Sequence, residues 1–375
     1  MEFTQRKKDG LQRGFFLVLT VFGIKLIFRY IYATMEKNKG ISNMDFYGMT
    51  LQALEEHFTR LGDNKAKAKI LFKAIYRNKQ AVEEITDLSD KTRQSILSSF
   101  TFDLPKQIAL QDEAETAKAL LKFPDSSRVE TVLMRHDYGA GLCVSTQVGC
   151  SMGCAFCQSG KLKKRRNLTA GEMTAQVLFM QQHSDIKHIS IMGIGEPLDN
   201  FDNLKAFIEI LSCPYGLAFG GRNITLSTCG LVPQIKRLTE IDCAFNLAVS
   251  LHAPTDDLRS RLMPVNKSYN IADLISAVKD YSEKTGRRTA FEYILLDNIN
   301  DSIEQAIQLA HLVKDLNCYV NLIPYNATDN PEFKRSRNAD TFFDTLKKQG
   351  VNTIFRREFG TGIKAACGQL SAEYD

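Results

Sequence analysis

The sequence predicts an α/β fold in which parallel strands form a partly closed barrel, preceded by a small helical domain. Strand-like and helical stretches alternate through residues 141–375, and such alternation implies parallel strands joined by right-handed crossovers. Several of these strands end at cysteine, glycine or polar residues, and the carboxyl ends of parallel strands are where such folds place their chemistry. A chain of 375 residues is long enough for one large core and one accessory domain.

The positive charge of the chain is concentrated at its start. The formal net charge is +5, but residues 1–40 hold eight Lys or Arg against three Asp or Glu, which leaves 40 basic and 40 acidic residues in the remainder. Any affinity for a polyanion must therefore come from local basic patches. Nine cysteines, an odd number in a large domain, indicate reduced thiols in a cytoplasmic protein and not a disulfide framework.

Residues 1–43 form a leader that allows three interpretations. Basic residues precede the apolar run from Gly14 to Phe28, which Lys25 interrupts and which is shorter than the about 20 residues that span a membrane. The leader is a mis-assigned start, with Met35 and Met44 as alternative starts, or a weak membrane-surface segment. The third interpretation is a secretory signal, although no small-residue cleavage site follows the apolar run.

Residues 44–105 have the apolar spacing of helices, as in Leu51, Leu54 and Phe58. A basic run follows these positions, and it consists of Lys65, Lys67, Lys69, Lys73, Arg77 and Lys79. Such a run is either a solvated helical face or a surface that contacts phosphates. We expect residues 44–105 to be a helical accessory domain.

Residues 106–140 predict a β-rich bridge into the core. The segments from Ala119 to Phe123 and from Val129 to Met134 are strand-like, and a turn at Pro124 separates them. They are therefore expected to pair as antiparallel strands.

The core is predicted to occupy residues 141–375. Its expected strands are 142–148, 188–192, 223–227, 245–251, 289–296, 319–323 and 352–356. Helical patterns between them cover 170–183, 203–211, 231–238, 271–285 and 302–316.

Three cysteines directly after the first core strand carry the clearest chemical signal. Cys150, Cys154 and Cys157 are spaced by three and then two intervening residues, and no fourth ligand lies near them in the sequence. Zinc sites usually have four ligands in two pairs. Three thiolates suit a [4Fe-4S] cluster with one open iron, which radical S-adenosylmethionine (SAM) enzymes use to bind their cosubstrate. Phe156 inside the loop also matches the pattern of that superfamily.

A glycine-rich turn with a carboxylate follows the second core strand. Its sequence is Met-Gly-Ile-Gly-Glu-Pro over residues 192–197. Glycine lets the backbone approach a ligand closely, and Glu196 can accept hydrogen bonds from an amino group. Alone the turn is weak evidence, but its position after the cysteine loop favours a SAM site.

These motifs and three others resemble the RlmN/Cfr family of RNA methyltransferases over about residues 44–372. The other motifs are Ser-Leu-His-Ala-Pro at 250–254, Asn-Leu-Ile-Pro-Tyr-Asn at 321–326 and Ala-Ala-Cys-Gly-Gln-Leu at 365–370. The resemblance implies a radical SAM partial (β/α)6-type barrel. The density of Lys and Arg in 44–105 predicts that this accessory domain binds the RNA. The resemblance also implies a [4Fe-4S] cluster on Cys150, Cys154 and Cys157, and two SAM molecules per turnover.

The resemblance further implies a ping-pong mechanism. One SAM methylates Cys367, and cleavage of the second gives a radical that takes hydrogen from this methyl group. The carbon radical then adds to an adenine carbon that is not nucleophilic. Cys143 matches the thiol that releases the product through a disulfide, and Glu130 matches the proton acceptor. The matching SAM contacts are Gly195, Glu196, Ser227, Ser250, Leu251, His252 and Asn326.

The expected partners follow from the same family. They are 23S rRNA, tRNA as a second RNA, and an electron donor such as flavodoxin or ferredoxin, while the protein itself is expected to be a monomer. A second basic run beyond the cysteine loop, formed by Lys161, Lys163, Lys164, Arg165 and Arg166, fits a polyanionic substrate.

Four interpretations of the function remain open at the level of sequence. RlmN-like enzymes modify carbon 2 of adenosine 2503 in 23S rRNA and, in some cases, tRNA adenosine 37. Cfr-like enzymes modify carbon 8 and confer resistance to ribosome-targeting antibiotics. Pro197 and the triplet 252–254 favour carbon 2. The alternatives of another kind are a radical SAM enzyme for a peptide or small metabolite and a metal-stabilised RNA-binding protein without catalysis.

Overall fold

The structure is a computed structural model that describes residues 44–241, 244–360 and 362–371. The leader of residues 1–43, for which three interpretations were open, lies outside the described residues. No helix in the described ranges is both long enough and apolar enough to cross a membrane.

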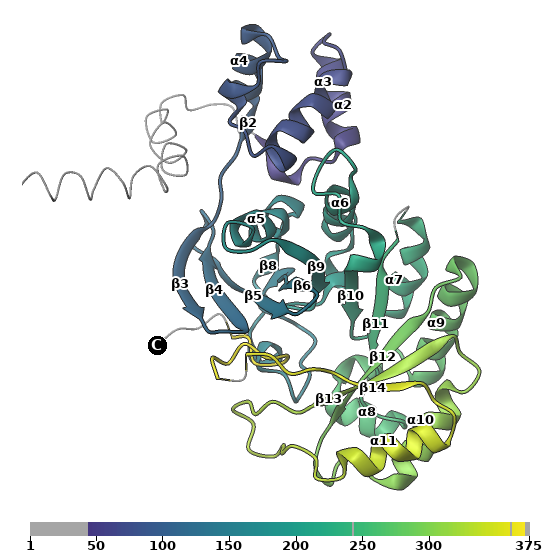
Figure 1. The fold of residues 1–375 in the computed structure, drawn as a ribbon. Helices are drawn as coiled ribbons and strands as arrows, with labels where there is room; N and C mark the ends of the chain where they lie inside the picture. The colour runs from purple at the N-terminus through teal and green to yellow at the C-terminus, as the bar shows by residue number, and fades with distance from the viewer. Residues whose placement is uncertain (1–43, 242–243, 361, 372–375) are drawn as a thin grey trace, which may run out of the picture.

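A ten-stranded sheet organises the molecule (Figure 1). Seven of its strands are parallel to their neighbours in one continuous run. In spatial order they are β6 (Gly139–Cys143), β9 (Ile186–Ile191), β10 (Ile224–Thr228), β11 (Asn246–Ser250), β12 (Thr289–Leu295), β13 (Cys318–Pro324) and β14 (Thr353–Phe355). All seven predicted core strands are present, so the predicted α/β core with parallel strands is confirmed.

The first predicted core strand is shorter than expected. It was expected to run to residue 148, but β6 ends at Cys143. The side chain of Gln176 accepts a hydrogen bond from Ser145 N at 3.0 Å and donates one to Ser145 O at 2.9 Å. The Gln176 amide thus satisfies the backbone N–H and C=O of Ser145, which would otherwise pair with a neighbouring strand, and the chain leaves the sheet here. It then forms β7 (Gln147–Val148), which pairs with β8 (Arg166–Asn167).

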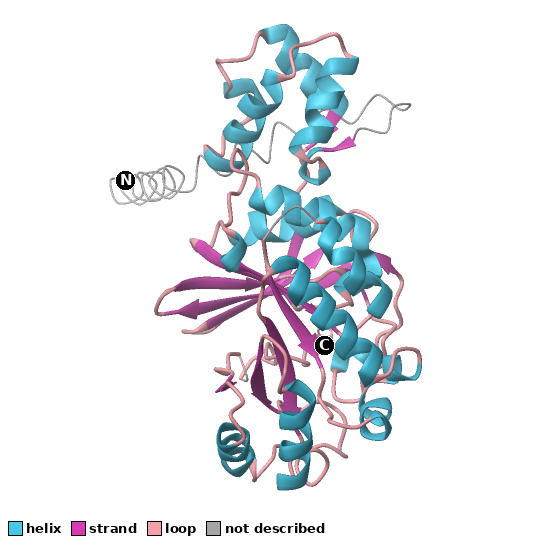
Figure 2. Ribbon diagram, turned by 90° about the vertical axis from the view of Figure 1, so that its right-hand side faces the viewer, coloured by secondary structure: helices cyan, strands magenta, loops and turns pink. Residues whose placement is uncertain are grey.

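Helices cover one face of the parallel strands (Figure 2). They are α5 (Ala170–Met180), α6 (Phe201–Ser212), α7 (Val232–Arg237), α9 (Ile271–Thr285), α10 (Ile303–Val313) and α11 (Ala339–Lys348). The sequence predicted the first five and missed α11 and the short α8 (Asp256–Leu262). Phe342 and Leu346, buried four residues apart in α11, were a helical signal.

The strand β12 shows how the two faces of the sheet differ. Phe291, Tyr293 and Leu295 belong to the main hydrophobic core beneath the helices. Because side chains alternate along a strand, Glu292 and Ile294 face the other way, into the inside of the curved sheet. This inner face is therefore partly polar and available for a ligand.

Three antiparallel strands extend the sheet beyond β6. They are β3 (Lys106–Asp112), β4 (Thr116–Lys122) and β5 (Arg128–His136), and β5 pairs with β6. The two antiparallel strands expected around Pro124 are present and longer than expected. Because β3, β4 and β5 continue the main sheet, they carry Glu130 directly beside the first parallel strand.

The N-terminal segment is a small helical unit. It contains β1 (Met44–Asp45), η2 (Phe46–Gly48), α2 (Leu51–Arg60), α3 (Ala66–Phe72), the π-helical turn η3 (Lys73–Arg77), η4 (Val82–Glu84), α4 (Asp90–Ser99) and β2 (Phe100–Thr101). Phe46 lies at its centre and contacts the rings of Phe72, Tyr76 and Phe100. Thr50 and Ser89 cap α2 and α4 by accepting backbone hydrogen bonds.

Two glycines, Gly48 and Gly171, lie at a close contact between this unit and the core. Gly171, in the first turn of α5, lies so close to Asp45 and Gly48 that a Cβ atom there would overlap the Asp45 carboxylate and come within 2.8 Å of Gly48 N. The backbone atom cannot move aside as a flexible side chain would. The close approach of the two parts therefore depends on the absence of a side chain at residue 171.

We expect Gly171→Ala to destabilise the protein by about 1–3 kcal/mol, because the added methyl overpacks a backbone contact. Chemical denaturation and limited proteolysis of the N-terminal unit are the measurements. Gly220→Ala is the matched control, since nothing lies within 4 Å of its Cβ position and its φ of −65° suits alanine. Equal stability of the two variants would contradict the role of this contact.

Candidate active site

The loop with the three cysteines is held by backbone hydrogen bonds on both sides. Cys150 N donates to Leu162 O at 3.1 Å, and Cys157 N donates to Cys154 O at 3.2 Å. Ala155 N donates to Leu262 O at 2.9 Å, which ties the loop to the end of α8. The short helix η5 (Gln158–Lys161) follows at once. The loop is therefore anchored while its thiols remain available as ligands.

The chemistry of the three thiols fits a [4Fe-4S] cluster. Burial raises the pKa of Cys150 to about 11 and that of Cys154 well above its ordinary value. Cys157 further raises the pKa of Cys150, and Cys157 and Cys150 both raise that of Cys154, which is consistent with three neighbouring thiols. Among the described residues no three His, Cys, Asp or Glu side chains already converge at metal-binding geometry. To hold a cluster, the three thiols would have to lose their protons.

Gly195 and Glu196 connect two strand ends. Gly195 has φ +106°, and a Cβ there would lie 2.6 Å from the Cβ of Gln147, so only glycine fits. The Glu196 carboxylate accepts hydrogen bonds from Leu198 N (3.0 Å), Thr228 Oγ1 (2.8 Å) and Cys229 N (2.8 Å). Burial raises its pKa. A carboxylate has further lone-pair positions, so Glu196 can bind a ligand amine while it joins β9 to the end of β10.

The remaining predicted SAM contacts lie at the ends of β10, β11 and β13. Ser227 is in β10, Ser250 ends β11, and Asn326 follows β13 and is 8% exposed. Ser250 is paired in register with Glu292 of β12. The structure therefore brings these residues, which the sequence separates widely, to the same edge of the sheet.

Leu251 and His252 form the turn after β11, and the His252 side chain stabilises this turn. Its Nδ1 accepts a hydrogen bond from Ile294 N at 3.0 Å, and its ring meets Phe156 of the cysteine loop edge-on at 4.7 Å. Burial lowers the pKa of His252 to about 3. The ring is therefore neutral near pH 7 and orders the turn without exchanging protons.

Arg259 of α8 supports the candidate site, a role that the sequence did not reveal. Its guanidinium is fully buried and donates to four acceptors. These are Leu251 O (3.2 Å), Asn266 Oδ1 (2.9 Å), Cys229 O (2.7 Å) and Ser250 O (3.0 Å). The one side chain fixes the turns after β10 and β11 relative to each other. An isolated arginine in a charged helix gives no sequence signal for this role.

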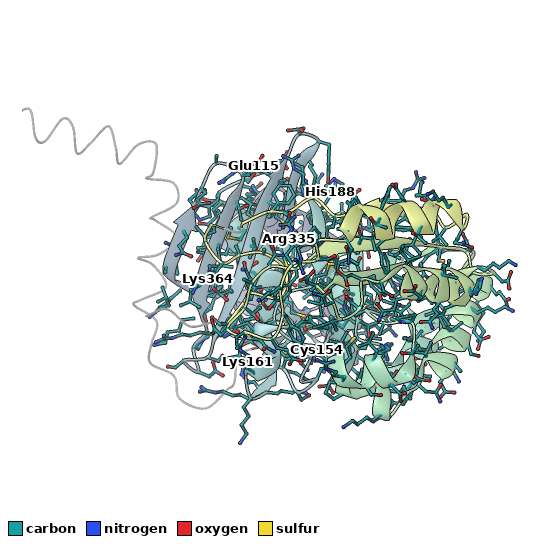
Figure 3. The ribbon with its side chains drawn as sticks, turned by 90° about the horizontal axis from the view of Figure 1, so that it is seen from below. Glu115, Cys154, Lys161, His188, Arg335 and Lys364 are labelled. Carbon is teal, nitrogen blue, oxygen red and sulfur yellow. The ribbon has the colours of Figure 1, made fainter. Side chains whose placement is uncertain are left out.

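The C-terminal segment 364–371 returns to the cysteine loop and brings Cys367 with it. Gln158 N donates to Gly368 O at 2.7 Å, and Ser159 Oγ donates to Leu370 O at 2.6 Å. On the other side Lys118 Nζ donates to Lys364 O at 3.3 Å. Figure 3 shows Lys364 over the antiparallel strands and Cys154 on the same face of the molecule. Cys367 is thus held between the loop and these strands.

Cys143 lies near Cys367 at the end of β6. Burial raises the pKa of Cys143 to about 12, and the charge of Cys367 is the second cause. Glu130 of β5 is fully buried, pairs with Lys118 Nζ at 3.0 Å, and accepts a hydrogen bond from Ser371 N at 2.8 Å. Glu130 and Cys143 thus both lie beside the C-terminal segment that carries Cys367. Lys118 was not predicted, because a lysine in a strand is ordinarily a surface residue.

The basic run beyond the cysteine loop is only partly free for a substrate. Lys164 pairs with Asp199 at 2.6 Å, and Arg166 forms two hydrogen bonds of 2.7 Å with Glu172. These two side chains therefore stabilise the fold. The exposed members of the run are Lys161, Lys163 and Arg165. Figure 3 shows Lys161 on the same face as Cys154.

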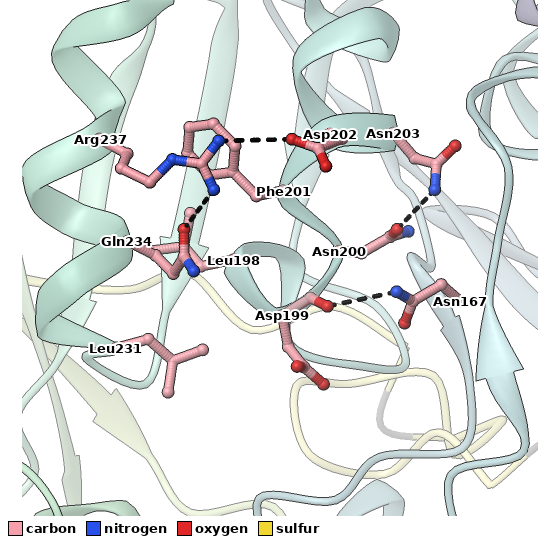
Figure 4. Close-up of a pocket in the computed structure, with 10 residues that line it drawn as sticks. All are labelled: Asn167, Leu198, Asp199, Asn200, Phe201, Asp202, Asn203, Leu231, Gln234 and Arg237. Carbon is pink, nitrogen blue, oxygen red and sulfur yellow. Dashed lines mark hydrogen bonds and ion pairs between the residues drawn. The ribbon is translucent and has the colours of Figure 1, made fainter.

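A polar pocket of about 260 Å³ lies next to the glycine-rich turn (Figure 4). Arg237 lies over the ring of Phe201 at 4.0 Å and donates to Gln234 at 3.1 Å. Asn167 donates to Asp199 O at 3.2 Å on the opposite wall. None of the predicted site residues lines this pocket, so we assign the chemistry to the cysteine loop and the strand ends.

Comparison with known proteins identifies the family of the chain. The model of the radical SAM superfamily matches residues 144–310. Curated relatives named "Probable dual-specificity RNA methyltransferase RlmN" include a protein of Spiroplasma citri, 45% identical over 87% of this chain and 97% of its own length. A protein of Enterococcus faecalis with the same name is 42% identical over 87% of this chain and 96% of its own length.

A solved structure supports the same assignment. The crystal structure of a radical SAM methyltransferase from Sphaerobacter thermophilus is 40% identical, covers 88% of this chain and all of its own, and superposes with a TM-score of 0.82. The predicted radical SAM fold is thus confirmed. Because the relatives are named as methyltransferases, they argue against the interpretation as a metal-stabilised RNA-binding protein without catalysis. The chain belongs to the RlmN family of radical SAM RNA methyltransferases.

Proposed function

We propose that this enzyme methylates carbon 2 of adenosine 2503 in 23S rRNA, and tRNA adenosine 37 as a second substrate. It does so by a ping-pong mechanism through S-methylated Cys367, with two SAM molecules per turnover. The observation that carries the proposal is the position of Cys367, held against the cysteine loop and near Cys143. The name shared by the relatives, dual-specificity RNA methyltransferase, supports two RNA substrates.

Cys150, Cys154 and Cys157 would hold the [4Fe-4S] cluster, and Glu196, Ser227, Ser250, Leu251, His252 and Asn326 would hold SAM beside Gly195. When bound and reduced by a donor such as flavodoxin or ferredoxin, the cluster supplies the electron that cleaves SAM to a 5′-deoxyadenosyl radical. The protein orients the reactants for this chemistry. Glu196 is suited to the SAM amine, and the amide of Asn326, buried at the end of β13, is suited to its polar groups.

Cys367 carries the methyl group because adenine carbons 2 and 8 are not nucleophilic and cannot displace a methyl group from SAM directly. Once the carbon bridges the protein and the RNA, the adduct is a radical and must give up one electron, which the oxidised cluster would accept, while the ring proton passes to Glu130. The Cys143 sulfur then bonds to the Cys367 sulfur, and the carbon–sulfur bond breaks. The carbon keeps that electron pair and takes a proton to become the methyl group. The disulfide must be reduced before the next turnover.

The reacting carbon is the detail on which the two branches of the family differ. Pro197 directly after Glu196 and the His-Ala-Pro triplet at 252–254 favour carbon 2, and the relatives carry the RlmN name. Mass spectrometry of the product nucleoside, with synthetic 2-methyladenosine and 8-methyladenosine as standards, decides between the two carbons. We expect 2-methyladenosine.

A basic stripe on the N-terminal unit is suited to RNA. Lys65, Lys69, Lys73 and Arg77 are exposed and lie four residues apart, so they share one side of α3 and η3. Among the described residues no ion pair occupies any of the four, whereas Lys67 pairs with Asp63 at 2.7 Å. We propose that this stripe contacts RNA phosphates.

Replacing Cys150, Cys154 or Cys157 by alanine should abolish the iron–sulfur absorbance and the cleavage of SAM. The reason is that three thiolates are needed to hold the cluster. Iron content and absorption spectra after anaerobic reconstitution are the measurements. Cys318→Ala is the control, because Cys318 begins β13, at the end of the strand opposite to the candidate site. Four irons per chain in a triple alanine variant would show that the ligands lie elsewhere.

Replacing Cys367 and Cys143 one at a time should separate the roles of the two thiols. Cys367→Ala should give no methylated adenine. Cys143→Ala should leave Cys367 methylated and trap a covalent protein–RNA species that migrates slowly on a denaturing gel. A Cys143→Ala protein that turns over normally, with no trapped species, would remove Cys143 from the mechanism. An unmethylated Cys367 in protein from SAM-replete cells would contradict the whole scheme.

Changing the basic stripe to glutamine at all four positions should weaken RNA binding and flatten its salt dependence. The slope of log K against log salt becomes shallower by about 0.7–0.9 for each phosphate that the protein no longer neutralises. A control with the same charge change is Lys279, Lys284, Lys347 and Lys348→Gln, on the exposed sides of α9 and α11. SAM cleavage without RNA should persist in both. Equal RNA affinities would reject the stripe as an RNA surface.

A further inference from the structure

Arg356 crosses the inside of the curved sheet. It follows β14, and its backbone N donates to Leu322 O at 2.9 Å. Its Nη1 donates to Glu292 Oε2 of β12 at 3.3 Å, and its Nη2 lies 3.1 Å from the sulfur of Met192, which follows β9. Two strands separate β9 from β12 in the sheet. A side chain that touches both must therefore lie within the curve, on the face opposite the helices.

Two further side chains fix the direction of the guanidinium. Glu292 has a side chain only 5% exposed, and Asn321 Nδ2 donates to both of its carboxylate oxygens at 3.1 Å. Ser250, Glu292 and Asn321 are neighbours in register on three adjacent strands. A buried carboxylate is costly unless a cation and hydrogen bonds satisfy it. The Glu292 carboxylate, itself held by Asn321, thus holds Arg356 in place.

The guanidinium lies close to both candidate thiols. It is the charged group that opposes the effects of burial and of Cys367 on the pKa of Cys143. The pKa of Arg356 is itself raised, mainly by the charge of Cys367. The proposed roles of the cysteine loop, the SAM contacts and the methyl carrier do not involve this cation. With 24% of its side chain exposed, it has surface left for a ligand.

We propose that Arg356 donates a hydrogen bond to a ring nitrogen of the target adenine, next to the carbon that is methylated, and that Glu292 and Asn321 are positioning residues for it. The proposal rests on the proposed function, because the reacting carbon must come into contact with the group on Cys367, beside which Arg356 lies. Carbon 2 lies between ring nitrogens 1 and 3, and carbon 8 lies next to nitrogen 7. All three are acceptors.

The chemistry of the guanidinium suits this contact. It is planar, remains charged, and has more N–H donors than its contacts with Glu292 and Met192 use. A donor on the neighbouring nitrogen holds the ring in the plane that presents the carbon to Cys367. It also draws electron density from the ring, and an electron-rich carbon radical adds more readily to an electron-poor ring.

The experiment combines protein and substrate changes. Target RNA oligonucleotides carrying 1-deazaadenosine, 3-deazaadenosine or 7-deazaadenosine, each lacking one ring acceptor, are methylated by wild type, Arg356→Lys, Arg356→Met and Arg357→Met. Arg357 is the matched control because it is the next residue and its charge is directed to Glu115 at 2.8 Å. Arg356→Lys keeps the charge beside Glu292 if Arg356→Met fails to fold. Mass spectrometry of Cys367 methylation reports separately on SAM binding.

For wild type and Arg357→Met, one of the deaza substrates should lower kcat/KM by about 10- to 100-fold, the decrease expected for one hydrogen bond to a charged donor. The Arg356 variants should already show this decrease in kcat/KM with the unmodified RNA. In these variants the same deaza substitution should lower kcat/KM by less than about a further threefold. Dissociation constants for the same RNAs, measured with Cys367→Ala protein that cannot turn over, should show the same pattern. Cys367 methylation should persist in both Arg356 variants.

Three outcomes would overturn the inference. The first is that wild type treats all deaza substrates like adenosine, a result that needs no variant to fold. The second is that the effects of the substrate change and of the Arg356 variants multiply, which means independent contacts. The third is absence of Cys367 methylation in the Arg356 variants, which would assign the residue to SAM. By contrast, a wild-type enzyme that methylates no adenosine would refute the proposed function itself.

Discussion

The arrangement of the active-site edge depends on the buried guanidinium of Arg259. A fully buried cation is costly unless its donors are satisfied, and this one is satisfied by the carbonyls of Cys229, Ser250 and Leu251 together with Asn266. Burial lowers its pKa. The carbonyls belong to turns that follow two different strands. Their mutual position is therefore set by one side chain, and the predicted SAM contacts Ser250, Leu251 and His252 are carried on those turns.

A second constraint joins parts of the chain that are far apart in the sequence. The C-terminal segment is bound by Gln158 and Ser159 on one side and by Lys118 and Glu130 on the other. This geometry exists because β3, β4 and β5 extend the parallel sheet, with Glu130 on β5 next to β6 and Lys118 on β4 one strand further out. The sheet extension is thus part of the active site as well as of the fold. It lets the carboxylate of Glu130, on an antiparallel strand, accept a hydrogen bond from the backbone of Ser371 near the end of the chain.

The sequence predicted the residues whose chemistry is tied to a short local pattern. The spacing of Cys150, Cys154 and Cys157 and the glycine-rich turn before Glu196 are local, so they could be identified without a structure. The parallel strands were equally accessible, because apolar runs alternate with helical spacing. The predicted end of β6 lay too far along the chain. The strand ends earlier because the side chain of Gln176, more than thirty residues away, binds the backbone of Ser145 in place of a neighbouring strand. The roles of Glu130, Cys143 and Cys367 came from resemblance, and they remain proposals.

By itself the sequence determined the fold class and the cysteine loop, because these follow from periodicity and from spacings within one loop, and it indicated the family because motifs along the chain resemble those of known proteins. Only the tertiary structure decided which charges are buried and what they hold. Arg259, Lys118, Glu292 and Arg356 are ordinary charged residues in the sequence, and their roles arise from partners on other strands. Conversely, Lys164 and Arg166 looked available for RNA but are held by Asp199 and Glu172. The free energy of a charge depends on burial and on neighbours brought together by folding, which no local pattern encodes.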